Sequence, residues 1–228
     1  MRKLKPPTMA HSWNLTPKEA VILQKQLSPM VIRKPGRKIK KIATIAGVDA
    51  HYRNGLATAA VVIINLPDLE TVEYTVAARR ADFPYISGLL AFREGPAILV
   101  ALKKLTVTPD ILIFDGQGIA HPQRFGIASH IGLLVDIPSV GCAKTKLLGQ
   151  YIEPDFEKGS FTYLTDRGET IGAAVRTRSS VKPVYVSIGH RMDLKDSIKI
   201  ILQCCDKYRL PEPIRRADKL ARKEARSS

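Results

Sequence analysis

The sequence predicts an α/β fold in which helices cover both faces of one mixed sheet, and two observations carry this prediction. After an N-terminal helix, three strand-like runs are joined by short links, and helical and strand-like stretches alternate after them. Short links pair strands antiparallel, whereas a helix between two strands pairs them parallel. A meander that continues into strand–helix–strand units therefore gives a mixed sheet.

The first predicted element is a helix that begins after Thr16. Thr16 is a typical N-cap, Pro17 suits the first helical position, and Glu19 completes a capping box. Ser28-Pro29 should end the helix, because the residue before a proline avoids the helical conformation. A basic loop, RKPGRKIKK, follows.

The three strand-like runs are KIATIAGVDAHY, LATAAVVIINL and TVEYTVAARR. Turn residues separate them, at Arg53-Asn54-Gly55 and at Pro67-Asp68. The next stretch, GLLAFREGPAILVALKKL, has a helical pattern, but Gly95-Pro96 should break or restart that helix.

The second half of the chain alternates strands and helices. ILIFDGQG contains a short apolar run typical of a strand buried on both faces, FGIASHIGLLVDI is helical, and SVGCAKTKLLG is strand-like. Further strands lie between about residues 160 and 190, and Asp193 can cap a last helix that ends before Leu210-Pro-Glu-Pro. This is the element order of the ribonuclease H-like architecture, with a sandwich of unrelated topology as the alternative.

Composition indicates a soluble protein of one domain. We expect that domain to span residues 1–228, with a basic arm and helix at 1–41 and a basic tail at 206–228. The chain contains no apolar stretch of membrane-spanning length, no secretory signal and too few cysteines for a disulfide framework. We therefore expect a cytoplasmic protein with no membrane partner, and a monomer.

The net charge of +15 is concentrated at the two ends of the chain. Residues 1–41 hold eleven Lys or Arg and one acid, residues 206–228 hold eight and four, and the middle holds seventeen and sixteen. Basic ends favour a polyanionic partner such as nucleic acid. A solubilising surface, or a thermostable protein rich in Lys and Arg, would give the same pattern.

Two aspartates, Asp49 and Asp115, stand at the ends of apolar strands, where a carboxylate is costly unless it is paired or binds a cation. If these strands are parallel neighbours, both carboxylates reach the crevice where open α/β sheets bind ligands. A divalent cation would relieve their repulsion. The alternative is two unrelated turn aspartates.

Four other segments are candidates for chemistry, and each has an ordinary structural explanation. Glu94 could face the same crevice or pair with Arg93 in solvent, and His190 could transfer protons or be a satisfied surface or core histidine. Lys144 could contact a phosphate or be solvated. The turn 84–88 could insert Tyr85 between bases or pack it on the core.

Five blocks of the chain, in order over residues 42–218, together resemble the endonuclease V family: IAGVDAHY, PYISGLLAFREGP, PDILIFDGQGIAHPQRFGIASHIGLLVDIPSVGCAKTKLLG, VYVSIGHRMDL and LPEPIRRAD. The resemblance implies a ribonuclease H-like fold and dependence on Mg²⁺, with Mn²⁺ as a substitute. It also implies cleavage of the second phosphodiester 3′ of deoxyinosine, leaving 3′-hydroxyl and 5′-phosphate ends.

Carried over residue by residue, the resemblance makes Asp49 and Asp115 metal ligands, and Glu94 completes the acidic metal cluster, directly or through water. His190 would lie near the attacking water or the leaving group, and Lys144 would face the scissile phosphate. Tyr85 would be the wedge that fills the gap left by the flipped base, with Pro84, Ile86 and Gly88 around it.

The lesion pocket is expected at Gly116, Gln117 and Gly118 and around Gly88, because glycine lets a backbone approach a ligand closely. Ser87 departs from the Pro that many bacterial members have, which leaves the choice between DNA and RNA open. Inosine-containing RNA is the alternative substrate. Outside this reaction, the alternatives are a catalytically silent nucleic-acid-binding module and a glycoside hydrolase with paired carboxylates.

Overall fold

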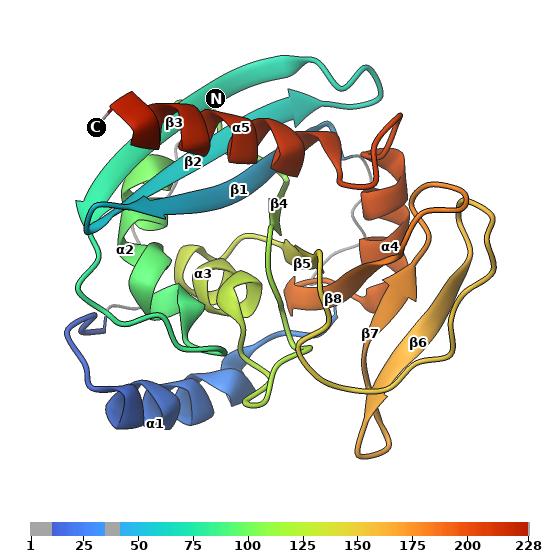
Figure 1. The fold of residues 1–228 in the computed structure, drawn as a ribbon, viewed down its shortest axis with the longest axis horizontal. Coiled ribbons are helices and arrows are strands. Elements are labelled where there is room, and N and C mark those ends of the chain that lie inside the picture. Colours follow the sequence, from blue (N-terminus) through green and yellow to red (C-terminus); the bar gives the residue numbers. More distant parts are fainter. Residues whose placement is uncertain (1–10, 35–41, 228) are drawn as a thin grey trace.

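The computed structural model describes residues 11–34 and 42–227 and is built on one eight-stranded mixed sheet (Figure 1). The strand order is β3-β2-β1-β4-β5-β8-β7-β6. The strands are β1 Thr44–Arg53, β2 Leu56–Asn65, β3 Thr71–Arg80, β4 Ile111–Phe114, β5 Ser139–Ala143, β6 Phe161–Asp166, β7 Glu169–Val175 and β8 Val184–His190. The helices are α1 Pro17–Leu27, α2 Leu90–Lys103, α3 Ile127–Val135, α4 Leu194–Gln203 and α5 Glu212–Ser227, with a short 3₁₀ helix at Ser28–Met30.

The predicted meander and the parallel pairs after it are confirmed. Strand β1 pairs antiparallel with β2 and parallel with β4, and β4 pairs parallel with β5. The β1–β2 turn is made by Asn54 and Gly55, whose φ angles of 49° and 80° suit the Asn-Gly pair. The register places Val48 of β1 beside Phe114 of β4.

Helices cover both faces of the sheet, as predicted. Helices α2 and α3 pack on one face, where Val48, Phe114 and Ile98 share a core. Helices α4 and α5 pack on the other face, where Ile45, Ile113 and Ile214 share a second core. The arrangement is the α/β fold of ribonuclease H-like type.

The predicted helix ends at Thr16 and Asp193 are confirmed. The Thr16 side chain accepts a hydrogen bond from the Glu19 amide, and the Glu19 carboxylate accepts one from the Thr16 amide at 2.7 Å. Asp193 caps α4 by accepting a hydrogen bond of 2.7 Å from the Asp196 amide. Such caps satisfy amides that have no partner inside the helix.

The predicted break at Gly95-Pro96 is wrong. Helix α2 continues through Pro96, because its buried face, which includes Phe92 before the proline and Ile98 after it, anchors the helix on both sides of the missing hydrogen bond. The basic amphipathic segment expected at residues 206–228 contains the helix α5, which packs across β1 and β2 (Figure 1). Gly47 of β1 allows this contact, because a Cβ there would lie 2.1 Å from the carbonyl carbon of Pro213.

Candidate functional site

Asp49 and Asp115 lie side by side at the end of the sheet where the central strand β4 ends. They follow Val48 and Phe114, which are partners in the parallel register of β1 and β4. The Asp115 amide donates a hydrogen bond of 3.2 Å to the Val48 carbonyl. The strand pairing on which the two-aspartate hypothesis depends is therefore present.

The site concentrates negative charge in a poorly solvated place. Burial raises the pKa of Asp49 to about 8, and the charge of Asp115 adds to this. Burial likewise raises the pKa of Glu94, on α2, to about 8, with further contributions from the charges of Asp49 and Asp115. The pKa of Asp115 is also raised, chiefly by burial. Three carboxyls that repel one another in this way favour a bound cation.

Lys144 is the cation that the chain itself brings to these carboxyls. It follows β5, and its Nζ forms an ion pair with Oδ2 of Asp115. Burial lowers the pKa of Lys144, but the hydrogen bond from its ammonium to Asp115 and the charges of the neighbouring aspartates outweigh that effect and leave its pKa raised. The structure thus brings Asp49, Glu94, Asp115 and Lys144 together, as the sequence-based hypothesis requires.

Asp218, on α5, is a fourth carboxylate at the site that the sequence analysis missed. Its charge raises the pKa of Asp49 and of Asp115 and also favours the charged form of Lys144. It pairs with Nε of Arg222 at 2.9 Å on the same helix. The spacing of the apolar residues Ile214, Ala217 and Ala221 could have revealed the helix that brings Asp218 to β1.

His190 does not belong to this site, and its prediction as a member is wrong. Strand β8 runs antiparallel to β5, and its last residue, His190, pairs with Ser139 at the start of β5. His190 therefore lies at the end of the sheet where β4 and β5 begin, whereas Asp115 lies at the end where β4 stops. There its Nε2 lies 3.2 Å from Oδ1 of Asp136, and its Nδ1 accepts a hydrogen bond of 3.4 Å from the Ile32 amide.

A cavity of about 300 Å³ opens beside the carboxyls, and Asp115 and Lys144 form part of its wall. The rest of its lining includes Tyr85, Ile86, Gly88, Gly116, Gln117 and His121. Tyr85 is 77% exposed, so its ring stands free at the cavity rather than in the core. Residues of the predicted wedge segment (residues 84–88) thus line the same cavity as Gly116 and Gln117 of the expected lesion pocket.

Pro84 and Gly118, which the sequence analysis placed with these groups, lie outside that lining. Pro84 lines a second cavity beside α2. Gly118 is buried against β8: its amide donates to Oγ of Ser187 at 2.8 Å, and a Cβ there would lie 2.0 Å from the Ile188 carbonyl oxygen. The glycine at 118 therefore allows close packing of the backbone, and its assignment to the pocket is wrong.

His121 is a cavity residue to which the sequence analysis gave no role. Its Nε2 lies 2.7 Å from the Gly88 carbonyl oxygen, and the Gln123 amide donates to its Nδ1 at 3.1 Å. Burial lowers the pKa of His121 to about 4, so the ring is neutral near pH 7. Gly88 has a φ of +84°, which glycine adopts without strain.

The amino-acid sequence is similar to the sequences of the endonuclease V family. The model of the endonuclease V family matches residues 25–219. The chain is 50% identical over 216 residues to endonuclease V of Methanothrix thermoacetophila, and the match covers 95% of each chain.

Two solved structures extend the likeness to the fold. Endonuclease V of Streptomyces avermitilis is 38% identical, with a TM-score of 0.89 over 99% of each chain. Endonuclease V of Ciona intestinalis, in complex with a 24mer DNA that contains an inosine followed by a ribo-adenosine, is 29% identical with a TM-score of 0.78 over 92% of this chain and 98% of that one.

Proposed function

The chain belongs to the endonuclease V family, and from this premise we propose that it cuts DNA at the second phosphodiester on the 3′ side of deoxyinosine. Like its family, it is a metal-dependent nuclease that hydrolyses phosphodiester bonds. The observation that carries the proposal is the position of Asp115, which belongs both to the carboxyl cluster and to the wall of the cavity. A base held in that cavity would bring its own strand to the carboxyls.

The residues at the cluster fit a divalent cation held by Asp49 and Asp115. The raised pKa values of Asp49 and Asp115 indicate that a positive charge beside these carboxyls is favourable. The Lys144 ammonium already pairs with Asp115. Within residues 11–34 and 42–227, no three His, Cys, Asp or Glu side chains come close enough to enclose a metal ion. Water and substrate phosphate would therefore complete the coordination, as is common for Mg²⁺. We propose Mg²⁺ as the cofactor and Mn²⁺ as a substitute.

Hydrolysis then follows from the placement of these charges. When bound, the cation supplies Lewis-acid chemistry, which activates the attacking water and neutralises charge on the phosphate. Asp49 and Asp115 hold that cation, and Glu94 and Asp218 increase the negative potential around it. Lys144 would turn from Asp115 toward the scissile phosphate, so that its positive charge stabilises the charge that develops there.

The cavity is suited to a base that has left the helix. Flipping a base costs a few kcal/mol, and the cost is least for a weakly paired base such as hypoxanthine. The lining combines apolar groups with backbone near Gly88 and Gly116, and glycine lets that backbone approach a ligand closely. A pocket shaped for the hypoxanthine oxygen would reject the adenine amine, because buried groups would lose their partners.

Tyr85→Ala should weaken lesion discrimination more than it weakens catalysis. The exposed Tyr85 ring would no longer fill the gap in the duplex, and stacking of a base on an aromatic ring is worth about 1–3 kcal/mol. We expect the kcat/KM ratio between deoxyinosine and matched deoxyadenosine duplexes to fall about 10-fold. Tyr74→Ala, which removes another exposed tyrosine from the edge strand β3, is the matched control. Unchanged discrimination in the Tyr85 variant would exclude it from recognition.

The choice between DNA and RNA is tested by matched oligonucleotides that carry one deoxyinosine or one riboinosine. The DNA proposal rests on the solved relative bound to DNA with an inosine, in which a ribo-adenosine follows the lesion. We expect faster nicking of the deoxyinosine strand. Faster nicking of the riboinosine strand would make the protein an endoribonuclease with the same active site. Binding of either strand without nicking would make it a silent binding module.

We further propose that one chain forms the working unit, as a single domain, in the cytoplasm. The sheet runs without interruption from β3 to β6, and both cores lie against it. Cys142, Cys204 and Cys205 are buried and unpaired, as expected in a reducing compartment. The structure contains no helix, within its described residues, that could cross a membrane.

A further inference from the structure

We propose that the hairpin of β6 and β7 holds the cavity walls in their binding shape and that Arg124 is the positioning residue through which it acts. The inference rests on the proposed function, because it assigns the cavity to the flipped base. It concerns the contacts behind the lining rather than the lining itself. It predicts that substrate recognition depends on a hairpin that lies outside the catalytic cluster.

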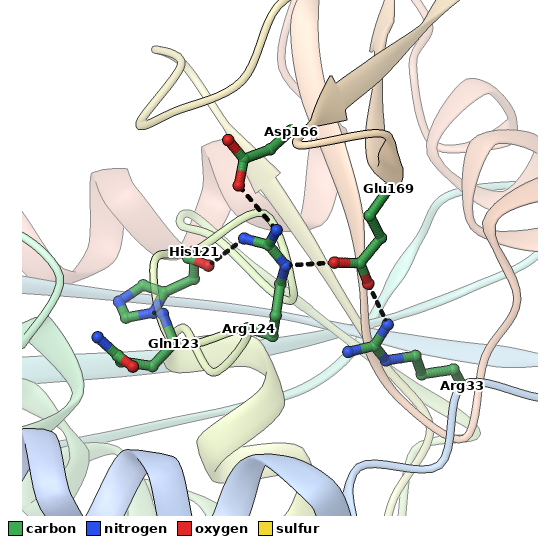
Figure 2. A network of polar contacts seen from close by, with 6 residues as sticks. All are labelled: Arg33, His121, Gln123, Arg124, Asp166 and Glu169. Carbon is green, nitrogen blue, oxygen red and sulfur yellow. Dashed lines mark hydrogen bonds and ion pairs between the residues drawn. The ribbon is translucent and has the colours of Figure 1, made fainter.

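Arg124 joins the hairpin to the segment that carries His121 (Figure 2). Its Nε bonds to Oε2 of Glu169 at 2.7 Å, and its Nη2 bonds to Oδ2 of Asp166 at 2.7 Å. Its third nitrogen, Nη1, donates to the His121 carbonyl oxygen at 3.0 Å. The Arg124 side chain is only 18% exposed. One of the three bonds reaches the His121 backbone, and the two ion pairs with the hairpin hold the planar, largely buried guanidinium that makes it.

His121 passes this constraint on to the wedge segment. Because the Gln123 amide donates to Nδ1, that nitrogen is the acceptor and Nε2 carries the proton. Nε2 therefore donates to the Gly88 carbonyl oxygen, at 2.7 Å. Both His121 and Gly88 line the cavity. A chain of hydrogen bonds thus runs from the hairpin through Arg124 and His121 to the wall formed by the wedge segment.

The same hairpin also supports a second part of the cavity lining. Gln150 forms an antiparallel bridge with Thr165 of β6, with N–O distances of 2.8 Å and 2.9 Å in the two directions. The segment just before Gln150 includes Lys146 and Leu147, which line the cavity. Lys146 Nζ in addition donates to the Gly149 carbonyl oxygen at 2.8 Å. Two parts of the cavity lining are therefore tied to one hairpin.

The chain offers a matched control in Arg33. Its guanidinium also pairs with Glu169, at 2.5 Å from Oε1 (Figure 2). In the part of the chain that the structure describes, the Arg33 side chain donates its hydrogen bond to Glu169, and Arg33 does not line the cavity. Arg33→Ala therefore removes an ion pair of the same network without releasing His121. A role in stability alone would make the two arginine variants alike in substrate recognition.

The test compares the wild-type protein, Arg124→Ala, Arg124→Lys and Arg33→Ala on a deoxyinosine duplex and a matched deoxyadenosine duplex with Mg²⁺. For Arg124→Ala we expect KM for the deoxyinosine duplex to rise about 10-fold, kcat to change less than about threefold, and discrimination to fall about 10-fold. Arg124→Lys should be intermediate, because lysine cannot make three directed bonds in one plane. Arg33→Ala should keep the wild-type discrimination within about twofold, because any loss of phosphate attraction from this basic segment affects both duplexes alike.

A second measurement is independent of activity. The ¹⁵N NMR signals of the His121 ring should show the Nε2–H form in the wild-type protein and in Arg33→Ala, and a mixture of both neutral forms in Arg124→Ala. If Arg124→Ala does not fold, Arg124→Lys and Glu169→Gln carry the same comparison. Arg124 variants that match Arg33→Ala in KM, discrimination and ring signals would overturn the inference. A wild-type protein that does not nick deoxyinosine would instead overturn the proposed function.

Discussion

Asp115→Asn is expected to lower the rate of nicking at least about 1,000-fold at saturating Mg²⁺, since a metal-bound site supplies several kcal/mol of charge stabilisation. Asparagine keeps the shape of the side chain but removes the charge that would hold the cation and that pairs with Lys144. Asp49→Asn should behave in the same way, because Asp49 lies beside Asp115 across the β1–β4 pair. Single-turnover nicking of a labelled duplex measures the effect.

Folding should survive these changes. Burial and like charge raise the pKa of both aspartates, so the neutral amide replaces a group that destabilises the folded state when it is ionised. The thermal unfolding midpoint in EDTA should therefore stay the same or rise. Asp206→Asn makes the same chemical change at an exposed position and should cut normally. Normal cutting by Asp115→Asn would show that the site has been placed wrongly.

Glu94→Gln is expected to make the metal-free protein more stable at pH 8 while abolishing its activity. The folded state keeps the Glu94 proton up to about pH 8, whereas the unfolded chain releases it near 4.5. The stabilisation that this proton gives the folded state is complete below pH 4.5, and it is lost as the pH rises through about 8. The ionised Glu94 of the wild-type protein should then cost up to several kcal/mol, at 1.36 kcal/mol per pKa unit. Glutamine avoids this cost.

Urea unfolding in EDTA between pH 7 and pH 8.5 measures this difference. The window lies above the ordinary histidine pKa of 6.5, because buried His121 acts with the opposite sign below it. The unfolding free energy of the wild-type protein should fall with pH, and the variant should show a shallower fall. Saturating Mg²⁺ should restore the stability of the wild-type protein more than that of Glu94→Gln. Parallel curves for the two proteins in EDTA would contradict the buried, charge-coupled position of Glu94.

The sequence predicted those features of the fold that depend on residues close together in the chain. The capping box at Thr16, the Asn54-Gly55 turn and the strand ends at Asp49 and Asp115 all follow from short segments. A short apolar strand does not encode its own direction, so the antiparallel course of β8, which takes His190 to the far edge, was not predictable from that segment.

Other features depend on contacts between distant segments. The apolar spacing along α5 indicates a helix, but it does not show that this helix packs on β1 and so brings Asp218 to the site. The network of Arg33, Arg124, Asp166 and Glu169 joins three separate segments. No local spacing relates these residues, so their role could be inferred only from the folded chain.

The most direct test of the central claim is nicking of a labelled duplex that contains one deoxyinosine, first with Mg²⁺ and then with EDTA. The proposed function predicts a nick one nucleotide beyond the lesion on its 3′ side, which disappears in EDTA and returns when Mg²⁺ is restored. A nick that persists in EDTA, or no nick at all with Mg²⁺ in protein of verified fold, would contradict the claim that this cluster is the metal centre of a deoxyinosine-specific endonuclease.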